Sequence, residues 1–156
     1  MGRYLVHMIT EYVLIKFLHI LIAILALGTS AGLGIVLEFY GDHPTHGAFV
    51  LGAIKRVVMF FVVPGYVLML VTGLWMTNLS WSMTTRWIQA ALVLWSVGMV
   101  LLAVSVTVLH KQIGLFNTEG PASSAYRKLS LLGRASGAAG GLIVIIILYF
   151  MVFKPA

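Results

Sequence analysis

The sequence predicts an all-α integral membrane protein, a bundle of four transmembrane helices in up-down order. Three observations predict this fold: 61% of the 156 residues are hydrophobic, only 9% are charged, and the hydrophobic residues fall into four long runs. A soluble domain has about 25% charged residues, and a small domain keeps much of its surface in water. We therefore expect lipid to be the solvent for the outer faces of this protein.

Each apolar run is long enough to cross a bilayer, because a hydrocarbon layer of about 30 Å takes roughly 20 residues as a helix. The expected spans cover about 12–37, 57–77, 87–109 and 135–153. Uninterrupted apolar runs exclude the alternating pattern of β-barrel strands. Residues 1–156 are therefore expected to form a single integral membrane domain embedded in the lipid bilayer.

The second expected helix contains Pro64-Gly65 near its first turns. Proline lacks a backbone N–H and clashes with the preceding turn, so a kink is predicted there. Turn residues between 40 and 53 predict a loop. The longest connection is expected over about 111–132, and within it the stretch 123–132 can form a short interfacial helix.

The basic residues predict membrane topology rather than a nucleic-acid site. The ten Lys and Arg give a net charge of +6, but they are spread in ones and twos between apolar runs, as topology signals are. Four spans place both termini on one side of the membrane. The loop side carries six basic residues against four on the side of the termini, which favours cytoplasmic loops and outer termini. The six are Lys55, Arg56, Lys111, Arg127, Lys128 and Arg134, and the four are Arg3, Lys16, Arg86 and Lys154.

Small residues line one face of each terminal helix: Gly28 and Gly32 in the first, and Gly137 and Gly141 in the fourth. Helices in lipid associate where small residues allow close approach. These faces either join the first and fourth helices within one bundle, or join the protein to a second copy or a larger membrane complex. Glu38 and Arg134 fall at the same membrane face and can pair between the same two helices.

His19 is the main candidate for a functional residue, because ionisable groups inside a membrane are costly and rare. It lies about seven residues into its span, roughly 10 Å deep. Its helix face continues through Ala23, Ala26 and Ser30, which leaves room for a flat cofactor or for a closely packed helix. The imidazole needs a hydrogen-bond partner or a metal at this depth.

Counting residues from the ends of the spans gives the side chains that lie deep enough to contact His19: Met69 at a similar depth, and Gln89, Trp95 and Tyr149 in the same half of the bundle. His and Met form a known axial pair for haem iron, and His alone also suffices. One hypothesis is therefore a b-type haem held by His19 with Met69 opposite. The other is that His19 hydrogen-bonds to a glutamine, a tyrosine or a backbone carbonyl, while Met69 only packs.

Other chemistry is sparse in this sequence. Asp42, His43 and His46 lie within one loop, which is either a surface metal site or a solvated turn. The absence of cysteine excludes disulfides, iron–sulfur clusters and cysteine-type zinc sites. Because no nucleophile–base arrangement or phosphate loop is visible, the sequence leaves open whether the protein is an enzyme.

Six stretches follow one another in a recognisable order: Lys16-Phe17-Leu18-His19-Ile20, Arg56-Val57-Val58, Val63-Pro64-Gly65, Leu70-Val71-Thr72-Gly73-Leu74-Trp75, Trp87-Ile88-Gln89-Ala90-Ala91-Leu92 and Met151-Val152-Phe153-Lys154-Pro155. In this combination the chain resembles the bacterial family of integral membrane proteins called domain of unknown function 2269. The resemblance covers nearly the whole chain. It implies a multi-pass protein of the bacterial inner membrane, whose termini the charge count places in the periplasm.

That family is itself similar to HemJ-type protoporphyrinogen oxidases and, more distantly, to membrane proteins of the copper-resistance D type. The HemJ-type pattern has a histidine in a Lys-x-Leu-His-Ile segment, which His19 matches. It also has a His-x-Lys pair opening the third helix, where this chain has Gln89 and Ala91. The lysine is missing, so protoporphyrinogen oxidation is not implied, whereas haem binding by His19 is.

Two functional hypotheses follow from the sequence. In the first, His19 holds a b-type haem in a redox or haem-handling role. In the second, the protein is a non-catalytic accessory or scaffold subunit that packs against a larger membrane complex through its glycine faces.

Overall fold

Helices make up almost all of residues 2–155, the part of the chain that this computed structural model describes, with side chains described from residue 10 onward. The elements are α1 (Gly2–Tyr40), α2 (Gly47–Val57), the π-helical segment η1 (Val58–Val62), α3 (Val63–Ser80), α4 (Arg86–Thr118) and α5 (Ser124–Phe153). No strand occurs among the described residues. The predicted all-α class is confirmed.

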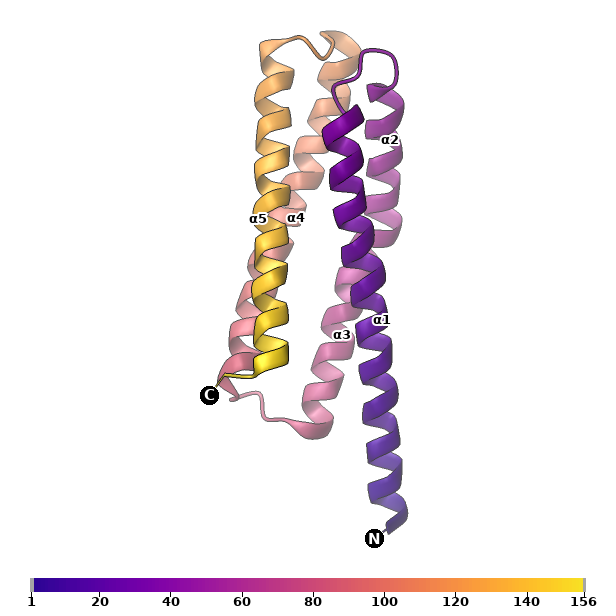
Figure 1. The fold of residues 1–156 in the computed structure, drawn as a ribbon, viewed down its shortest axis with the longest axis vertical. Helices are drawn as coiled ribbons and strands as arrows, with labels where there is room; N and C mark the ends of the chain where they lie inside the picture. The colour runs from indigo at the N-terminus through magenta and orange to yellow at the C-terminus, as the bar shows by residue number, and fades with distance from the viewer. Residues whose placement is uncertain (1, 156) are drawn as a thin grey trace.

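The segments α2, η1 and α3 follow one another without a break and form one rod over residues 47–80. The described chain thus contains four rods with membrane-crossing stretches of 30 to 34 residues, each about 45–50 Å long. Successive rods run in opposite directions, and both ends of the chain lie at the same end of the molecule (Figure 1). The predicted four-helix, up-down bundle is confirmed.

The first connection is shorter than predicted, because α2 begins at Gly47 rather than after residue 53. His43 closes the turn before it: its Nδ1 accepts the backbone N–H groups of Thr45 and His46 at 3.2 and 3.3 Å. The prediction of a loop over 47–53 is wrong. Each rod exceeds the roughly 30 Å of hydrocarbon, so its ends extend into the headgroup layer, where polar residues do not stop a helix.

The connection between α4 and α5 is also shorter than predicted, since α4 continues to Thr118 and α5 begins at Ser124. Ser123 caps α5, because its Oγ accepts the backbone N–H of Tyr126 at 3.1 Å, which satisfies one of the unpaired donors of the first turn. The separate interfacial helix predicted over 123–132 is therefore wrong; these residues form the N-cap and first turns of α5.

Proline distorts the second rod, and the helical turn directly before the proline is irregular. Pro64 has no N–H to donate to the carbonyl of Phe60, and its ring crowds that carbonyl. The helix widens into the π-helical segment Val58–Val62, where the hydrogen-bond spacing is longer by one residue. The axis of α3 is turned relative to that of α2 beyond this segment, which is the predicted kink (Figure 1).

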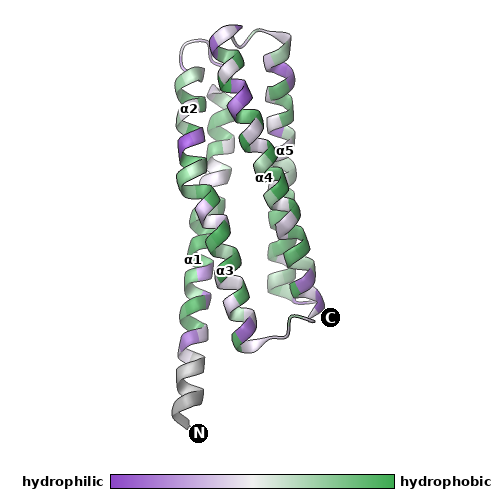
Figure 2. Cartoon of the chain, turned by 180° about the vertical axis from the view of Figure 1, so that it is seen from behind, coloured by the Kyte–Doolittle hydropathy of each residue, from purple (hydrophilic) through white to green (hydrophobic). Residues whose placement is uncertain are grey.

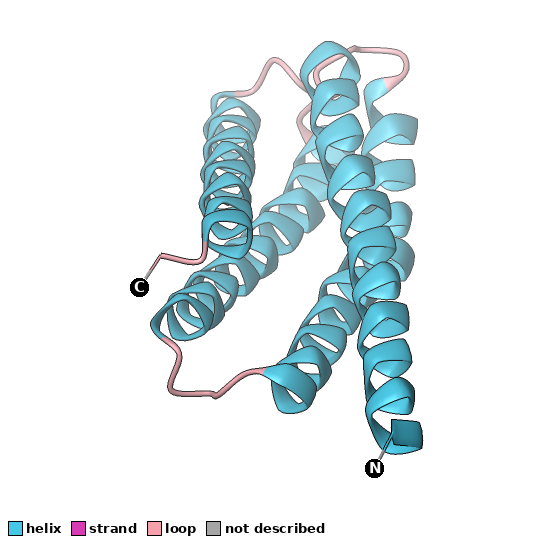
Figure 3. Cartoon of the chain, turned by 60° about the horizontal axis from the view of Figure 1, so that its bottom comes forward, coloured by secondary structure: helices cyan, strands magenta, loops and turns pink. Residues whose placement is uncertain are grey.

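The rods pair into two hairpins. α1 packs along α3, and α4 packs along α5, whereas contact between α1 and α5 is limited. The two hairpins meet mainly where α2 lies against α4, and they diverge toward the chain ends (Figure 3). A buried core marks the junction, formed by four side chains that are at most 7% exposed: Leu51, Ile54, Leu109 and Tyr126.

The outer faces of the rods are apolar. Phe60, Phe49 and Phe39 expose 83%, 78% and 73% of their surface, and hydrophobic residues cover most of each rod, with polar residues gathered nearer the ends (Figure 2). A soluble protein rarely exposes apolar patches of more than a few hundred Å². The fold is therefore that of an integral membrane protein with four spans.

Candidate functional site

His19 is hydrogen-bonded across the α1–α3 contact, with its Nδ1 2.8 Å from Oγ1 of Thr72. The Thr72 hydroxyl also lies 2.8 Å from the carbonyl oxygen of Leu68 and 3.2 Å from that of Met69. A carbonyl only accepts and a hydroxyl has one proton, so a Thr72 hydroxyl that donates to a carbonyl accepts from the N–H at Nδ1. With the hydroxyl proton on a carbonyl, the imidazole proton is on Nδ1 and the lone pair on Nε2; with the hydroxyl proton directed at Nδ1, the tautomer is reversed.

Besides the Thr72 hydroxyl, the imidazole of His19 faces the backbone carbonyl of Met69. A histidine that binds a metal through one ring nitrogen usually donates the N–H of the other to a neighbouring group, as Nδ1 of His19 can to Thr72. The site can therefore offer a neutral imidazole nitrogen, held in one orientation by Thr72, as a metal ligand or a proton acceptor.

The small residues beside His19 bring α1 against α3. Ala26 is 1% exposed, and a Cβ built on Gly65 would lie 2.6 Å from the Cβ of Ala26. A Cβ on Gly73 would lie 3.3 Å from Cε1 of His19. Of the two sequence-based alternatives for this face, a flat cofactor or a closely packed helix, the packed helix fills it at Ala26.

The other groups expected near His19 lie differently. Met69 faces the imidazole and the Thr72 hydroxyl through its backbone carbonyl. Gln89, Trp95 and Tyr149 lie on the α4–α5 hairpin, and no hydrogen bond in the described part of the chain joins them to His19. The role of Met69 as a second iron ligand stays a prediction.

The histidine-containing loop is occupied by its own contacts. The rings of His43 and His46 stack with centroids 4.8 Å apart. The carboxylate of Asp42 accepts from Nη2 of Arg134 at 2.6 Å and from Oγ of Ser130 at 3.3 Å. Within the described residues, no group of three His, Cys, Asp or Glu side chains is placed to hold a metal ion.

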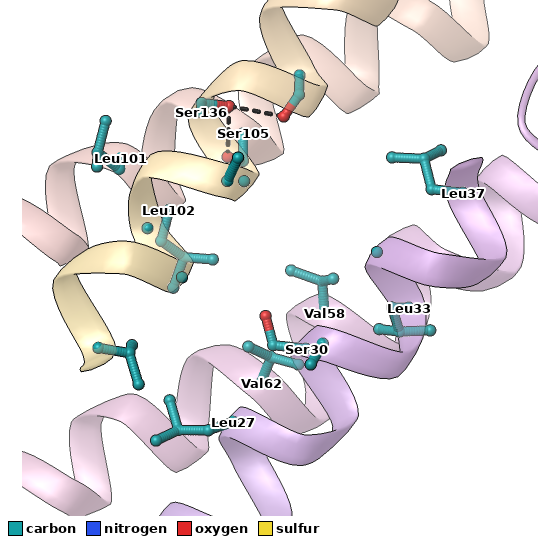
Figure 4. A pocket seen from close by; sticks show the side chains of 18 of the residues that line it. Leu27, Ser30, Leu33, Leu37, Val58, Val62, Leu101, Leu102, Ser105 and Ser136 are labelled. Carbon is teal, nitrogen blue, oxygen red and sulfur yellow. Dashed lines mark hydrogen bonds between the residues drawn. The ribbon is translucent and has the colours of Figure 1, made fainter. Parts of the chain in front are cut away.

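A cavity of about 990 Å³ lies between the two hairpins. Val58, Val62 and Ser30 project from the α1–α3 hairpin across the space from Leu102 of α4 (Figure 4). The lining is mainly aliphatic. Its two serines on the opposite wall, Ser105 and Ser136, satisfy each other with an Oγ–Oγ distance of 2.8 Å.

The glycine faces line this cavity instead of touching each other. A Cβ built on Gly28, Gly32, Gly137 or Gly141 would meet nothing within 4 Å, and all of these except Gly32 line the cavity. The interpretation that these faces join the first and fourth helices is wrong, because α1 packs on α3, and α5 on α4, through other residues. Their role in binding a partner stays a prediction.

The end of the cavity nearest the loops is polar. Arg134 lies with its Nε 3.2 Å from Oε2 of Glu38 and its Nη2 2.6 Å from Oδ2 of Asp42. The predicted pairing of Glu38 with Arg134 is confirmed, and Asp42 joins it. Glu38 and Arg134 are the charged residues among those that line the cavity in the described chain.

Gln112 completes this polar end, and the sequence did not single it out. The side chain is 2% exposed, lines the cavity, and has no hydrogen-bond partner in the described part of the chain. The expected span ended at Leu109, which left Gln112 in a presumed loop. A signal was present, since Gln112 lies three residues after Leu109 and therefore on the same helix face.

A comparison with protein families agrees with this geometry. The family model described as "Predicted integral membrane protein (DUF2269)" matches residues 13–155. The chain belongs to the DUF2269 family. No match was found among curated proteins or among solved structures. For this DUF2269 protein, the similarity to HemJ-type oxidases and to copper-resistance D-type proteins stays a prediction, as does its bacterial origin.

Proposed function

We propose that this DUF2269 protein binds an apolar molecule of the bilayer in the cavity between its two hairpins. The observation that carries the proposal is the size and lining of that cavity, about 990 Å³ bounded mainly by aliphatic and glycine residues. Ligand sites are commonly apolar cavities of about 300–1,000 Å³, and in helix bundles they lie between facing helices.

The open glycines support an occupant rather than an empty space. Protein interiors are packed as densely as organic crystals, and walls without a neighbour lose their dispersion contacts. Gly28, Gly137 and Gly141 present bare backbone to the cavity with nothing within 4 Å of an added Cβ. An elongated hydrocarbon chain can lie against such a surface more closely than it can against branched side chains.

Photo-crosslinking tests this function. The protein in lipid nanodiscs is incubated with a diazirine-labelled hexadecane, irradiated, and digested to locate the label. We expect labelled peptides from both cavity walls. Gly28→Leu should reduce that labelling at least severalfold, because its side chain enters the cavity, whereas Gly32→Leu is equally unhindered but lies outside the cavity lining and should not. Equal labelling of the two variants would refute the proposal.

The alternative role, an accessory or scaffold subunit, is favoured by the same unpartnered glycines at Gly28, Gly32, Gly137 and Gly141. A transmembrane helix of a partner, or of a second copy, would then fill the space. This role predicts co-purification of a larger complex from membranes in mild detergent, which Gly28→Leu would abolish, and no labelling of the cavity by hexadecane.

Haem binding by His19 is a separate proposal, favoured by the lone pair that Nε2 carries when Nδ1 donates to Thr72. Thr72 orients the ring at 2.8 Å, and Nε2 would hold the iron of a b-type haem, which would supply one-electron redox chemistry. The contact of Ala26 with Gly65 leaves no slot for a porphyrin at that point between α1 and α3. The group would therefore have to lie outside that contact, with Met69 or a neutral group opposite.

An absorption spectrum tests the haem proposal. Protein purified in mild detergent from haem-replete cells should show a Soret band that His19→Ala removes. His110→Ala serves as the matched control, because His110 lies in α4 beside Lys55, with a distance of 2.8 Å between Lys55 Nζ and His110 Nδ1. A colourless, folded protein would exclude this role.

The proposed location is the bacterial inner membrane, with both termini in the periplasm. The basic residues at the loop end of the bundle, six against four at the other end, support this orientation. A reporter that is active only in the periplasm, fused after Ala156, should be active. Activity of a cytoplasmic reporter at the same position would reverse the orientation.

A further inference from the structure

We infer that the apolar molecule in the cavity carries an uncharged polar head, a hydroxyl or carbonyl group, which hydrogen-bonds to the side chain of Gln112. This inference rests on the proposed function and names the chemical class of its ligand. It follows from the unpartnered amide of Gln112, from the charge of the cavity lining, and from the position of Gln112 along the bundle.

The Gln112 side chain is built into the cavity wall without a protein partner. It is 98% buried, since 2% of its surface is exposed, and no hydrogen bond reaches it from the described residues. Gly133 of α5 makes room for it: a Cβ there would lie 3.4 Å from Oε1 of Gln112. The amide atoms of Gln112 are not among the fully buried side-chain atoms that lack a partner, so its small exposed surface is where a partner in the cavity can stand.

An amide offers two N–H donors and one carbonyl acceptor. A hydroxyl head can both donate to it and accept from it, and a carbonyl head can accept from its N–H groups. A wholly apolar ligand would leave every one of these groups unpaired. The chemistry of Gln112 therefore selects amphiphiles over plain hydrocarbons.

The charges at this end of the cavity disfavour an anionic head. Glu38 and Arg134 are the charged members of the described lining, and they pair with each other at 3.2 Å. Asp42 engages the same guanidinium at 2.6 Å, so one cation is shared by two carboxylates. The guanidinium is therefore already paired, and the described lining offers no second cation to an anionic head, whereas a hydroxyl or carbonyl head needs none.

The position of Gln112 matches the way an amphiphile lies in a bilayer. Gln112 is six residues before the end of α4 at Thr118, about 9 Å along the axis, which places it near the headgroup layer. The lining continues along α5 from Arg134 to Leu148, about 20 Å at 1.5 Å per residue. A head at Gln112 therefore leaves length for one extended apolar chain directed toward the chain ends.

The test uses the full chain in lipid nanodiscs and three photoreactive probes with the same diazirine-bearing C16 chain: the alkane, the alcohol, and the phosphate monoester. We expect the alcohol to label the cavity walls about tenfold more than either other probe, since one buried hydrogen bond is worth about a factor of ten. Gln112→Leu should reduce alcohol labelling to the level of the alkane. Gln89→Leu, an exposed glutamine of the same helix outside the lining, should leave it unchanged.

The outcomes separate this inference from the function on which it rests. Equal labelling of the cavity by all three probes would overturn the inference and leave the proposed function standing. Preference for the phosphate would overturn it too. Absence of label from the cavity walls with every probe would overturn both. Thermal unfolding of the ligand-free Gln112→Leu variant checks that it is folded. Its midpoint should be unchanged or raised, because the substitution removes an amide that has no protein partner.

Discussion

Replacement of Gly65 by alanine is expected to force α1 away from α3 and to destabilise the bundle. The new Cβ would lie 2.6 Å from the Cβ of Ala26, well inside van der Waals contact, and Ala26 is only 1% exposed. Overpacking of this kind typically costs about 1–3 kcal/mol. We expect a fall in the thermal unfolding midpoint and in the yield of monodisperse protein in mild detergent.

Gly52→Ala is the matched control for this substitution. Gly52 lies in the same rod, and a Cβ built there meets nothing within 4 Å. Alanine has a higher helix propensity than glycine by up to about 1 kcal/mol, so this variant should be as stable as the parent protein or slightly more stable. A midpoint for Gly65→Ala equal to that of Gly52→Ala would show that α1 and α3 are not in close contact.

Truncation of Tyr126 to alanine should separate the two hairpins at their junction. The ring is 0% exposed, belongs to the core with Leu51, Ile54 and Leu109, and packs edge-on against Phe116 with centroids 5.7 Å apart. Truncation of a buried aromatic residue typically costs about 3–5 kcal/mol. The expected result is a large drop in the unfolding midpoint.

Two further variants resolve the contribution of Tyr126. Its hydroxyl donates to the carbonyl oxygen of Gly41 at 2.7 Å, so Tyr126→Phe leaves a buried acceptor unpaired and should cost about 1–3 kcal/mol. Tyr149→Ala, on the same helix but 53% exposed, should change the midpoint little. If Tyr126→Ala and Tyr149→Ala were equally stable, the hairpins would have to be joined elsewhere.

The spans could be predicted from sequence because lipid imposes a simple rule: a segment that crosses the hydrocarbon must be helical, and most of its residues must be apolar. The helix ends could not. Gly47, Thr118 and Ser124 set the observed ends, and they lie outside the apolar windows. A hydropathy argument cannot tell a polar helical turn in the headgroup layer from a loop. Local capping decides this, as at Ser123, which accepts from the N–H of Tyr126.

The candidate sites, too, could be predicted from the sequence only in part. The depth of His19 left its facing helix open, since groups on all three other spans lie at a similar level. In the structure the facing helix is α3, and the partner is Thr72, a residue that depth alone does not distinguish from Met69 three positions earlier. Small residues indicated close helix contacts, yet a glycine only permits approach. Gly65 is in contact with α1, whereas Gly28 and Gly137 border a cavity. Which glycines touch depends on how the hairpins are set against each other, and no local pattern encodes that.

The opening between the hairpins is tested most directly by disulfide formation in native membranes, because the chain has no cysteine of its own. Ser105→Cys/Ser136→Cys should oxidise rapidly to an intramolecular disulfide, since the two hydroxyl oxygens lie 2.8 Å apart. Gly28→Cys/Gly137→Cys should stay reduced under the same conditions, because neither position has a neighbour within 4 Å of its Cβ. Rapid oxidation of the Gly28/Gly137 pair would mean that the glycine faces touch, and it would contradict the cavity and the binding function assigned to it.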